Sequence, residues 1–213
     1  INVNEDNKYY ASIDGVLCNK SRTQIIHYPA GKEGPYDTPA GVTSIGERAF
    51  ANCYNLTSIN VSEGVVSIGD YAFSDCNYLI SVSMPESLTS IGNGSFSECS
   101  NLDTLSLQNG ITSIGDNAFE NCLSLENIDI PGSVTHIGEN AFADCIVLTN
   151  INVNENNRNY ASNDGVLFNK SLTQLIRCPA KKGDSYIIPR GVTSICDYAF
   201  SGCWDLESIN IPD

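Results

Sequence analysis

A 23-residue unit recurs along the chain and constrains its fold more than any other feature. The unit occurs six times without insertion or deletion, five times over residues 41–155 and once over residues 191–213. With small variations, each copy reads Ser-Ile-Gly, then Ala-Phe, then Cys, then Leu-x-x-Ile-x-Ile. One such unit cannot bury its own apolar face, so the copies must stack into a solenoid.

A longer unit of 35 residues occurs twice, at residues 6–40 and 156–190. Both copies contain Tyr-Ala-Ser, Asp-Gly-Val-Leu and Asn-Lys-Ser, and then Thr-Gln and Pro-Ala. Apolar runs on either side of the turn at 169–171 predict a β-hairpin, which we expect to project from the stack or to widen one coil. Neither end of the chain carries a recognisable polar cap, so we expect a fragment of a longer protein.

Local patterns within the 23-residue unit predict its secondary structure. The spacing Leu-x-x-Ile-x-Ile is typical of a short parallel strand, and Ser-Ile marks a second extended stretch. The near-helical spacing of Ala49, Phe50 and Cys53 predicts one short helical or 3₁₀ turn. Gly46 is expected to permit a tight bend, and the acidic or amide residue that follows it is expected to cap free N–H groups. Cys196 replaces this glycine in the last copy, so either the bend needs no positive φ or that coil is strained.

These patterns together predict an α/β fold, a right-handed leucine-rich-repeat solenoid with short parallel strands and one short helical or 3₁₀ turn per coil. The motif S-I-G-x-x-A-F-x-x-C-x-x-L-x-x-I-x-I resembles the BspA-like, Treponema pallidum-type, leucine-rich-repeat family over essentially the whole chain. The resemblance implies a curved solenoid with its parallel sheet on the concave face. It also implies a surface or secreted protein, whose better-known relatives are adhesins, and it supplies no catalytic residues.

Charge excludes several classes of partner. The chain has a formal net charge of −14, which argues against nucleic acids and anionic membrane surfaces because both require clustered Lys and Arg. No apolar run approaches the roughly 18 residues that would cross a bilayer. All basic residues except Arg48 fall within the two 35-residue units.

Two groups of residues are candidates for partner binding. Tyr and Arg are typical interface residues, and they favour a contact site in the second 35-residue unit. This group consists of Tyr160, Arg177, Lys181, Lys182 and Tyr186. The alternative is that its tyrosines cover the core of a widened coil. Small polar residues on exposed strand positions form the second group, which consists of Asn127, Asp129, Asn150 and Asn152. For these, the alternative is a solvated ladder of polar side chains.

Reactive residue types give no catalytic or metal-binding pattern. Six cysteines occupy one column of the repeat, which favours small buried side chains over disulfides between coils. No Cys-x-x-Cys pair suggests zinc, no nucleophile or phosphate-binding motif occurs, and the histidines His27 and His136 belong to no repeated cluster. We therefore expect no catalytic site, no metal and no cofactor.

The predicted function is an extracellular or cell-surface scaffold for protein interaction or adhesion. Its partner is expected to be a host or neighbouring-cell protein, with a glycan as the second possibility. A glycan-binding accessory module of a larger surface protein and a structural spacer are the alternatives, and neighbouring sequence would separate them. A fold analogy alone does not decide among these functions.

Overall fold

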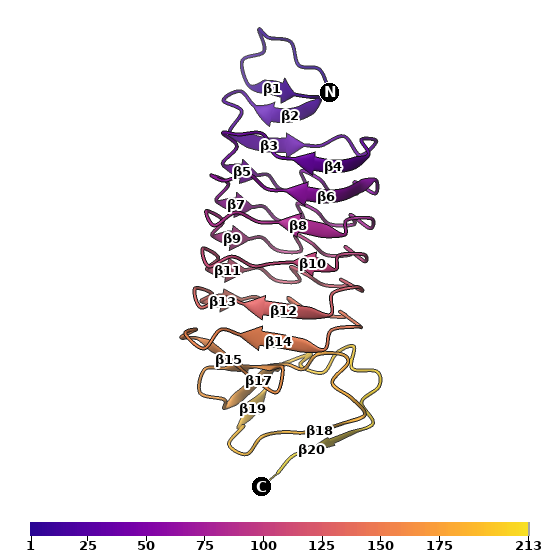
Figure 1. The fold of residues 1–213 in the computed structure, drawn as a ribbon, viewed down its shortest axis with the longest axis vertical. Coiled ribbons are helices and arrows are strands. Elements are labelled where there is room, and N and C mark those ends of the chain that lie inside the picture. The colour runs from indigo at the N-terminus through magenta and orange to yellow at the C-terminus, as the bar shows by residue number, and fades with distance from the viewer. Residues whose placement is uncertain (213) are drawn as a thin grey trace.

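The computed structural model describes residues 1–212, which form a long stack of coils with the two ends of the chain at opposite ends of the long axis (Figure 1). Two ladders of parallel strands run along the stack. The first ladder begins with three antiparallel strands near the N-terminus. The third of these strands pairs in parallel with the first Ser-Ile segment, and the Ser-Ile segments of successive coils then pair with one another. We call this parallel part the Ser-Ile ladder. The strands of the first ladder are β1 (Tyr10–Ile13), β2 (Val16–Asn19), β3 (Gln24–His27), β5 (Ser44–Ile45), β7 (Ser67–Ile68), β9 (Ser90–Ile91), β11 (Ser113–Ile114) and β13 (His136–Ile137).

The second ladder contains the Leu-x-x-Ile-x-Ile strands, and we call the surface that it presents the strand face. It consists of β4 (Gly34–Asp37), β6 (Leu56–Asn60), β8 (Ser81–Ser83), β10 (Thr104–Leu105), β12 (Asn127–Ile130) and β14 (Asn150–Val153). β4 to β10 form one sheet, and β12 pairs only with β14, so the hydrogen-bonded ladder is interrupted between β10 and β12. Partners such as Ser58 and Ser81 lie one repeat apart, which confirms the predicted parallel stacking.

Residues 156–212 form the last part of the stack. Their strands are β15 (Tyr160–Asn163), β16 (Val166–Asn169), β17 (Gln174–Arg177), β18 (Ser185–Ile187), β19 (Ser194–Ile195) and β20 (Ser208–Asn210). β16 and β17 pair antiparallel, as the hairpin pattern predicts, and β15 adds a third strand that the pattern did not reveal. This meander neither projects nor simply widens a coil, because its last strand, β17, pairs in parallel with β19.

A column of aromatic rings lies at the centre of the main stack. Adjacent ring centroids are 4.8 to 5.7 Å apart from Tyr28 through to Phe142, a spacing typical of favourable ring pairs. The column stops at Phe142, because Cys178 stands where the first 35-residue unit has Tyr28. The core is correspondingly divided into one large apolar cluster and a small one around Phe168 and Tyr186.

The Ala-Phe segment is a series of turns, so the predicted helical or 3₁₀ turn is wrong. Residues 1–212 contain strands and turns but no helix, which makes the fold an all-β solenoid and not α/β. Alternate N–H groups of this segment donate to carbonyls of the next coil: Arg48 to Asp70, Phe50 to Ala72 and Asn52 to Ser74. Arg48 and Asn52 have φ values of 53° and 61°. Left-handed residues and donors that point to another coil both prevent a continuous helix.

The glycine of Ser-Ile-Gly is required by close packing, and the chain turns there without a positive φ, which was one of the two alternatives. Gly69 and Gly92 do not have positive φ, and neither does Cys196 in the last coil. A Cβ on Gly92 would lie 2.6 Å from the backbone carbon of Gly69 and 2.7 Å from the amide nitrogen of Asp70. Glycine is therefore needed because the backbones of successive coils approach each other too closely for a side chain.

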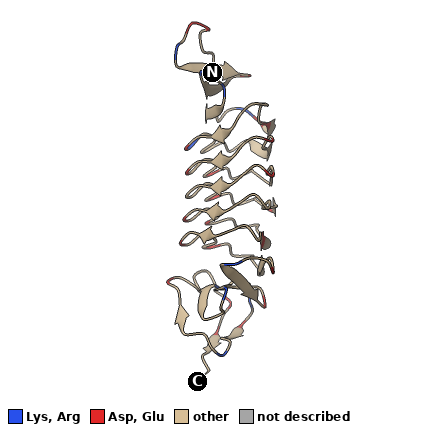
Figure 2. Cartoon of the chain, turned by 90° about the vertical axis from the view of Figure 1, so that its left-hand side faces the viewer, with Lys and Arg blue, Asp and Glu red and all other residues tan. Residues whose placement is uncertain are grey.

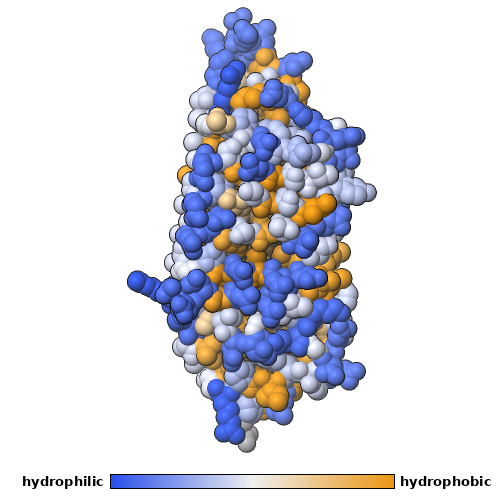
Figure 3. Space-filling view, in the orientation of Figure 1, coloured by the Kyte–Doolittle hydropathy of each residue, from blue (hydrophilic) through white to orange (hydrophobic). Residues whose placement is uncertain are grey.

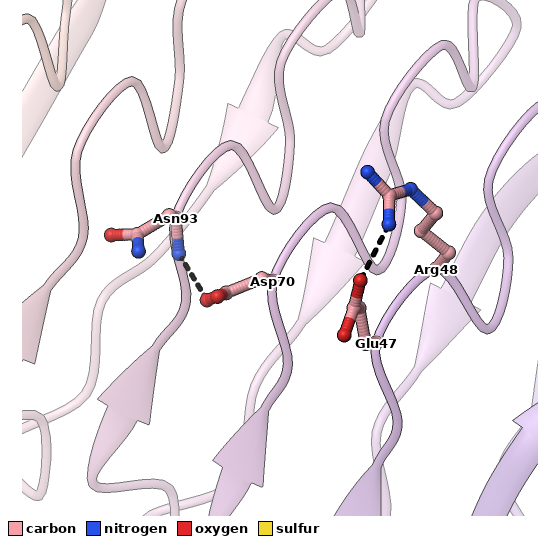
Figure 4. Close-up of polar contacts among 4 residues, drawn as sticks. All are labelled: Glu47, Arg48, Asp70 and Asn93. Atoms are coloured by element: carbon pink, nitrogen blue, oxygen red, sulfur yellow. Dashed lines mark hydrogen bonds and ion pairs between the residues drawn. The ribbon is translucent and has the colours of Figure 1, made fainter.

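The acidic and amide side chains after this glycine cap N–H groups, as predicted, but the groups belong to the next coil. The Asp70 carboxylate accepts from the N–H of Asn93 at 2.7 Å (Figure 4). The Asn93 side chain accepts in the same way from Asp116, and Asp116 from Glu139, both at 2.8 Å. In the first coil Glu47 instead pairs with Arg48 at 2.5 Å (Figure 4).

The column of cysteines carries free thiols and is buried except at Cys203, which is half-buried. In the middle coils each thiol donates to the main-chain carbonyl of the phenylalanine in the preceding coil, as Cys76 does to Phe50 and Cys99 to Phe73, both at 3.1 Å. The Cys53 thiol donates in the same way to the carbonyl of Tyr28 at 3.7 Å. Burial raises the pKa of Cys99 well above its ordinary value and that of Cys53 to about 11. The prediction of small buried side chains is confirmed, and the hydrogen bond explains why a thiol suits the position better than alanine.

The close approach of successive coils predicts that Gly92→Ala destabilises the protein. Its methyl group would meet main-chain atoms of the previous coil, so we expect a loss of about 1–3 kcal/mol in the free energy of unfolding. Urea denaturation measures this loss. Gly31→Ala is the control, because Gly31 has no positive φ and nothing lies within 4 Å of its added Cβ. Equal stability of the two variants would contradict the packing explanation.

The thiols predict a definite order of alkylation. Thiolates react and thiols do not, so the buried column should stay unlabelled by iodoacetamide at pH 8 until the protein unfolds. Cys203 is half-buried, and the neighbouring Cys178 thiol and the Arg177 charge lower its pKa although its burial opposes this shift. Mass spectrometry of peptides should therefore find Cys203 labelled first. Early labelling of Cys99 would show that the column is accessible.

Candidate binding surfaces

The strand face presents columns of small polar side chains above a buried apolar layer. Alternate residues of each strand point inward, and Ile59, Val82 and Ile128 are almost fully buried. The residues between them point outward because successive side chains of a strand lie on opposite faces. In the space-filling view, weakly polar and apolar side chains follow the middle of the stack between more hydrophilic edges (Figure 3).

The structure brings the four polar strand residues together as two pairs. The Asn150 side-chain amide donates to the Asn127 side-chain oxygen at 3.0 Å. In the parallel column, the Asn152 amide donates to the Asp129 carboxylate at 2.9 Å. These hydrogen bonds hold exposed side chains in fixed orientations, which lowers the entropy that a partner would have to remove on binding.

Two shallow hollows lie on the strand face. The first, of about 380 Å³, lies over β4 to β10 and includes Tyr36, Ser83 and Met84 in its lining. The second, of about 450 Å³, lies over β10 to β14 and includes Asp129 and Asn152. Tyr36 is one of the tyrosines of the 35-residue units, and it covers the core: its ring packs against Tyr28, and its hydroxyl is buried without a hydrogen-bond partner in the described chain.

The predicted binding residues of the second 35-residue unit do not form an exposed patch. Tyr186 is buried, with its ring centroid 6.3 Å from that of Phe200, and the half-buried Tyr160 accepts the N–H of Ile137 through its hydroxyl at 2.9 Å. These tyrosines cover the core, which was the alternative interpretation. Lys181 and Lys182 form ion pairs with Asp205 at 2.5 Å and Asp164 at 2.8 Å, respectively.

Arg177 is buried and its guanidinium is used within the molecule. Its two terminal nitrogens donate to the main-chain carbonyls of Tyr198 and Ser201, both at 2.7 Å. In the regular stack, main-chain N–H groups of the preceding coil supply donors to this turn. The 35-residue unit has no Ala-Phe segment, but its Cys178 N–H still donates to the Ala199 carbonyl. The Arg177 side chain replaces the main-chain donor to the Ser201 carbonyl. Burial lowers the pKa of Arg177.

Charge is unevenly distributed over the stack. Lys and Arg gather near the two ends, and Asp and Glu follow the edges of the middle coils (Figure 2). Asp129 is exposed on β12 and lines the second hollow. Asp103 and Glu126 are exposed immediately before β10 and β12. Acidic side chains therefore lie on and beside the middle of the strand face.

Comparison with known proteins identifies the family. The model for the BspA type leucine rich repeat region matches six copies, over residues 36–149, 75–181 and 180–213. The chain belongs to the BspA type leucine-rich-repeat family. No curated protein is similar enough to serve as a relative.

Solved structures of bacterial leucine-rich-repeat proteins share the fold. One from Eubacterium ventriosum is 28% identical with a TM-score of 0.73, and the match covers 95% of this chain and 60% of that one. A leucine rich cell surface protein from Faecalibacterium prausnitzii is 25% identical with a TM-score of 0.63, covering 97% and 77%. The pneumococcal vaccine antigen PcpA, 23% identical with a TM-score of 0.70, covers 96% and 62% and shows the fold alone. This chain spans about 60% of the length of the Eubacterium ventriosum chain and of the PcpA chain. No helix within residues 1–212 is long and apolar enough to cross a membrane.

The role of Arg177 predicts that Arg177→Met destabilises the part of the chain after residue 155. The carbonyls of Tyr198 and Ser201 would lose their charged donor, at a cost of about 1.5–3 kcal/mol. Limited proteolysis should then cleave residues 156–213 earlier than in the parent protein. His27→Met is the control, because His27 occupies the same place in the first copy and is exposed. Equal cleavage of both variants would mean that Arg177 is not required.

Proposed function

We propose that the chain is a non-catalytic scaffold of an extracellular or cell-surface protein and that it binds a protein partner through the strand face. The observation that carries this proposal is the pairing of Asn127 with Asn150 and of Asp129 with Asn152 beside a hollow of about 450 Å³. A protein partner could form hydrogen bonds to these fixed polar side chains and place its own side chains in the hollows. Leucine-rich repeats are typically interaction scaffolds, and the fold supplies no support for a catalytic role.

Extended shape supports a protein as the partner. The polar columns run over six successive strands, and solenoids commonly use such extended surfaces for binding. Tyr36 lines the first hollow, but its ring packs against the buried Tyr28 and its hydroxyl is itself buried. A partner side chain that filled this hollow would therefore contact exposed polar residues such as Ser83.

Charge supports a basic partner. The formal net charge is −14, and the strand face carries exposed acids in its middle. Complementary charge accelerates encounter and is weakened by salt. We therefore propose that the partner presents Lys and Arg to this face, either on a host protein or on a protein of a neighbouring cell.

The proposed location rests on similarity. The Faecalibacterium prausnitzii relative is a leucine rich cell surface protein, and the same placement is proposed for the protein that contains this chain. A glycan-binding module and a structural spacer are the competing functions. Glycan binding is less favoured because the polar columns of the strand face contain few aromatic side chains for stacking on sugars.

Binding is tested with the whole chain against a panel of purified extracellular matrix proteins and against a glycan array. We expect one or more matrix proteins to bind, with an affinity that falls as NaCl concentration rises. Ser83→Arg combined with Asn152→Arg should weaken binding about tenfold or more, because both exposed side chains line the hollows and an added cation repels a basic partner.

Val66→Arg is the matched control, because Val66 is exposed outside the strand face, next to the Ser-Ile ladder. It should leave binding unchanged. Equal loss in both variants would exclude the strand face as the binding surface. Binding to the glycan array alone would support the glycan-binding module, and silence on both panels would support the spacer.

A further inference from the structure

A cavity of about 510 Å³ lies where the stack of 23-residue coils meets the second 35-residue unit. We call it the junction cavity. Three segments line it: residues 137–142 of the last regular coil, parts of residues 160–177, and residues 195–198 of the final coil. Its volume falls within the roughly 300–1,000 Å³ typical of sites for small molecules.

The cavity exists because one Ala-Phe segment is missing. Residues 156–190 have no such segment, so the turn of coil 133–155 faces that of coil 191–213 across a gap. Contacts bound the gap: the Ser201 hydroxyl bonds the Asp144 carboxylate at 3.3 Å, and Tyr160 caps the edge of β13. Neither side chain closes the space between them.

Main-chain donors remain open at the wall of the cavity. In each preceding coil, three N–H groups of the turn donate to the next coil, as those of 117, 119 and 121 do to 139, 141 and 143. The equivalent N–H groups of Asn140, Phe142 and Asp144 have no acceptor in the described chain, and Asn140 and Phe142 line the cavity. Clustered free N–H groups of this kind favour an anion.

Arg177 adds a buried positive charge to the same cavity. It lines the cavity and is only 6% exposed. No carboxylate forms an ion pair with it among residues 1–212, and its Nε atom has no hydrogen-bond partner. The Asp144 carboxylate is near enough to act on this charge but forms no ion pair with it. A buried charge without a directly paired counterion is costly, so an anion in the cavity would relieve this cost.

The remaining lining limits the anion to a single charge and a polar body. Glu139 and Asp197 are exposed at the cavity and would repel a multiply charged group such as phosphate. Asn169 and Gln174 provide amides that bond hydroxyl groups. Phe142 and Ile176 provide an apolar surface.

We propose that the junction cavity binds a small polar monocarboxylate of the size of a sugar acid. The carboxylate takes the charge of Arg177 and the open N–H groups of Asn140 and Phe142. Hydroxyl groups of the ligand bond the amides of Asn169 and Gln174. This site is separate from the strand face, so a test of ligand binding here does not depend on the proposed function.

Calorimetric titration of the full chain with D-glucuronate and with D-glucose tests the proposal. The two sugars differ in the carboxylate, so glucuronate should bind with a Kd at least about tenfold lower than that of glucose. Equal affinities, or no heat from glucuronate at millimolar concentration, would overturn the proposal.

A matched pair of variants locates the site. Gln174→Glu places a carboxylate in the cavity, where it competes with the ligand for Arg177, so it should weaken glucuronate binding at least about tenfold. Gln24→Glu introduces the same change at the equivalent place in the first copy, which lies far along the stack and lacks the arginine (Figure 1). It should bind glucuronate as the parent does. Unchanged binding in Gln174→Glu, or equal loss in both folded variants, would contradict this location.

Discussion

Hydrogen bonds between the main chains of successive coils are the interaction on which this structure depends. They join coils in both ladders and in the turns between them, so each coil is a template for the next. This demand for register explains the fixed length of the regular unit, because one added residue would move every donor away from its acceptor. It also explains Gly92 and the equivalent glycines, which let the backbones approach within bonding distance.

Repetition made much of the fold predictable, because a residue type that recurs at one place in the unit reports its environment several times over. The parallel ladders, the buried phenylalanine and cysteine columns and the hairpin all follow from this. The turns at Ala-Phe were mispredicted as helical because spacing along the chain does not reveal that alternate N–H groups bond another coil. The role of the glycine was misread for the same reason, since its constraint comes from a neighbouring coil.

The candidate site was predictable only where it followed the repeat. Asn127 and Asn150 lie in one column, so their proximity follows from the period alone. Arg177 and Tyr186 lie in the interrupting unit, and their composition suggested an exposed interface. Tyr186 is buried because it occupies the inward strand position that isoleucine holds in the regular unit. Arg177 is buried because its guanidinium donates to the turn of the final coil. No sequence pattern shows that the side chain of Arg177 replaces a main-chain donor.

The end of the aromatic column at Phe142 has a mechanical consequence. On the N-terminal side of that ring, the coils share one continuous apolar cluster. On the other side, Leu167 still belongs to that cluster, but the smaller cluster around Phe168 is joined to the stack without the three turn hydrogen bonds that link the preceding coils. A tensile load applied between the two ends of the chain would concentrate its strain at this plane. We expect the final coils to detach there as a unit while the rest of the stack stays closed, which would make the junction the weakest link of the rod.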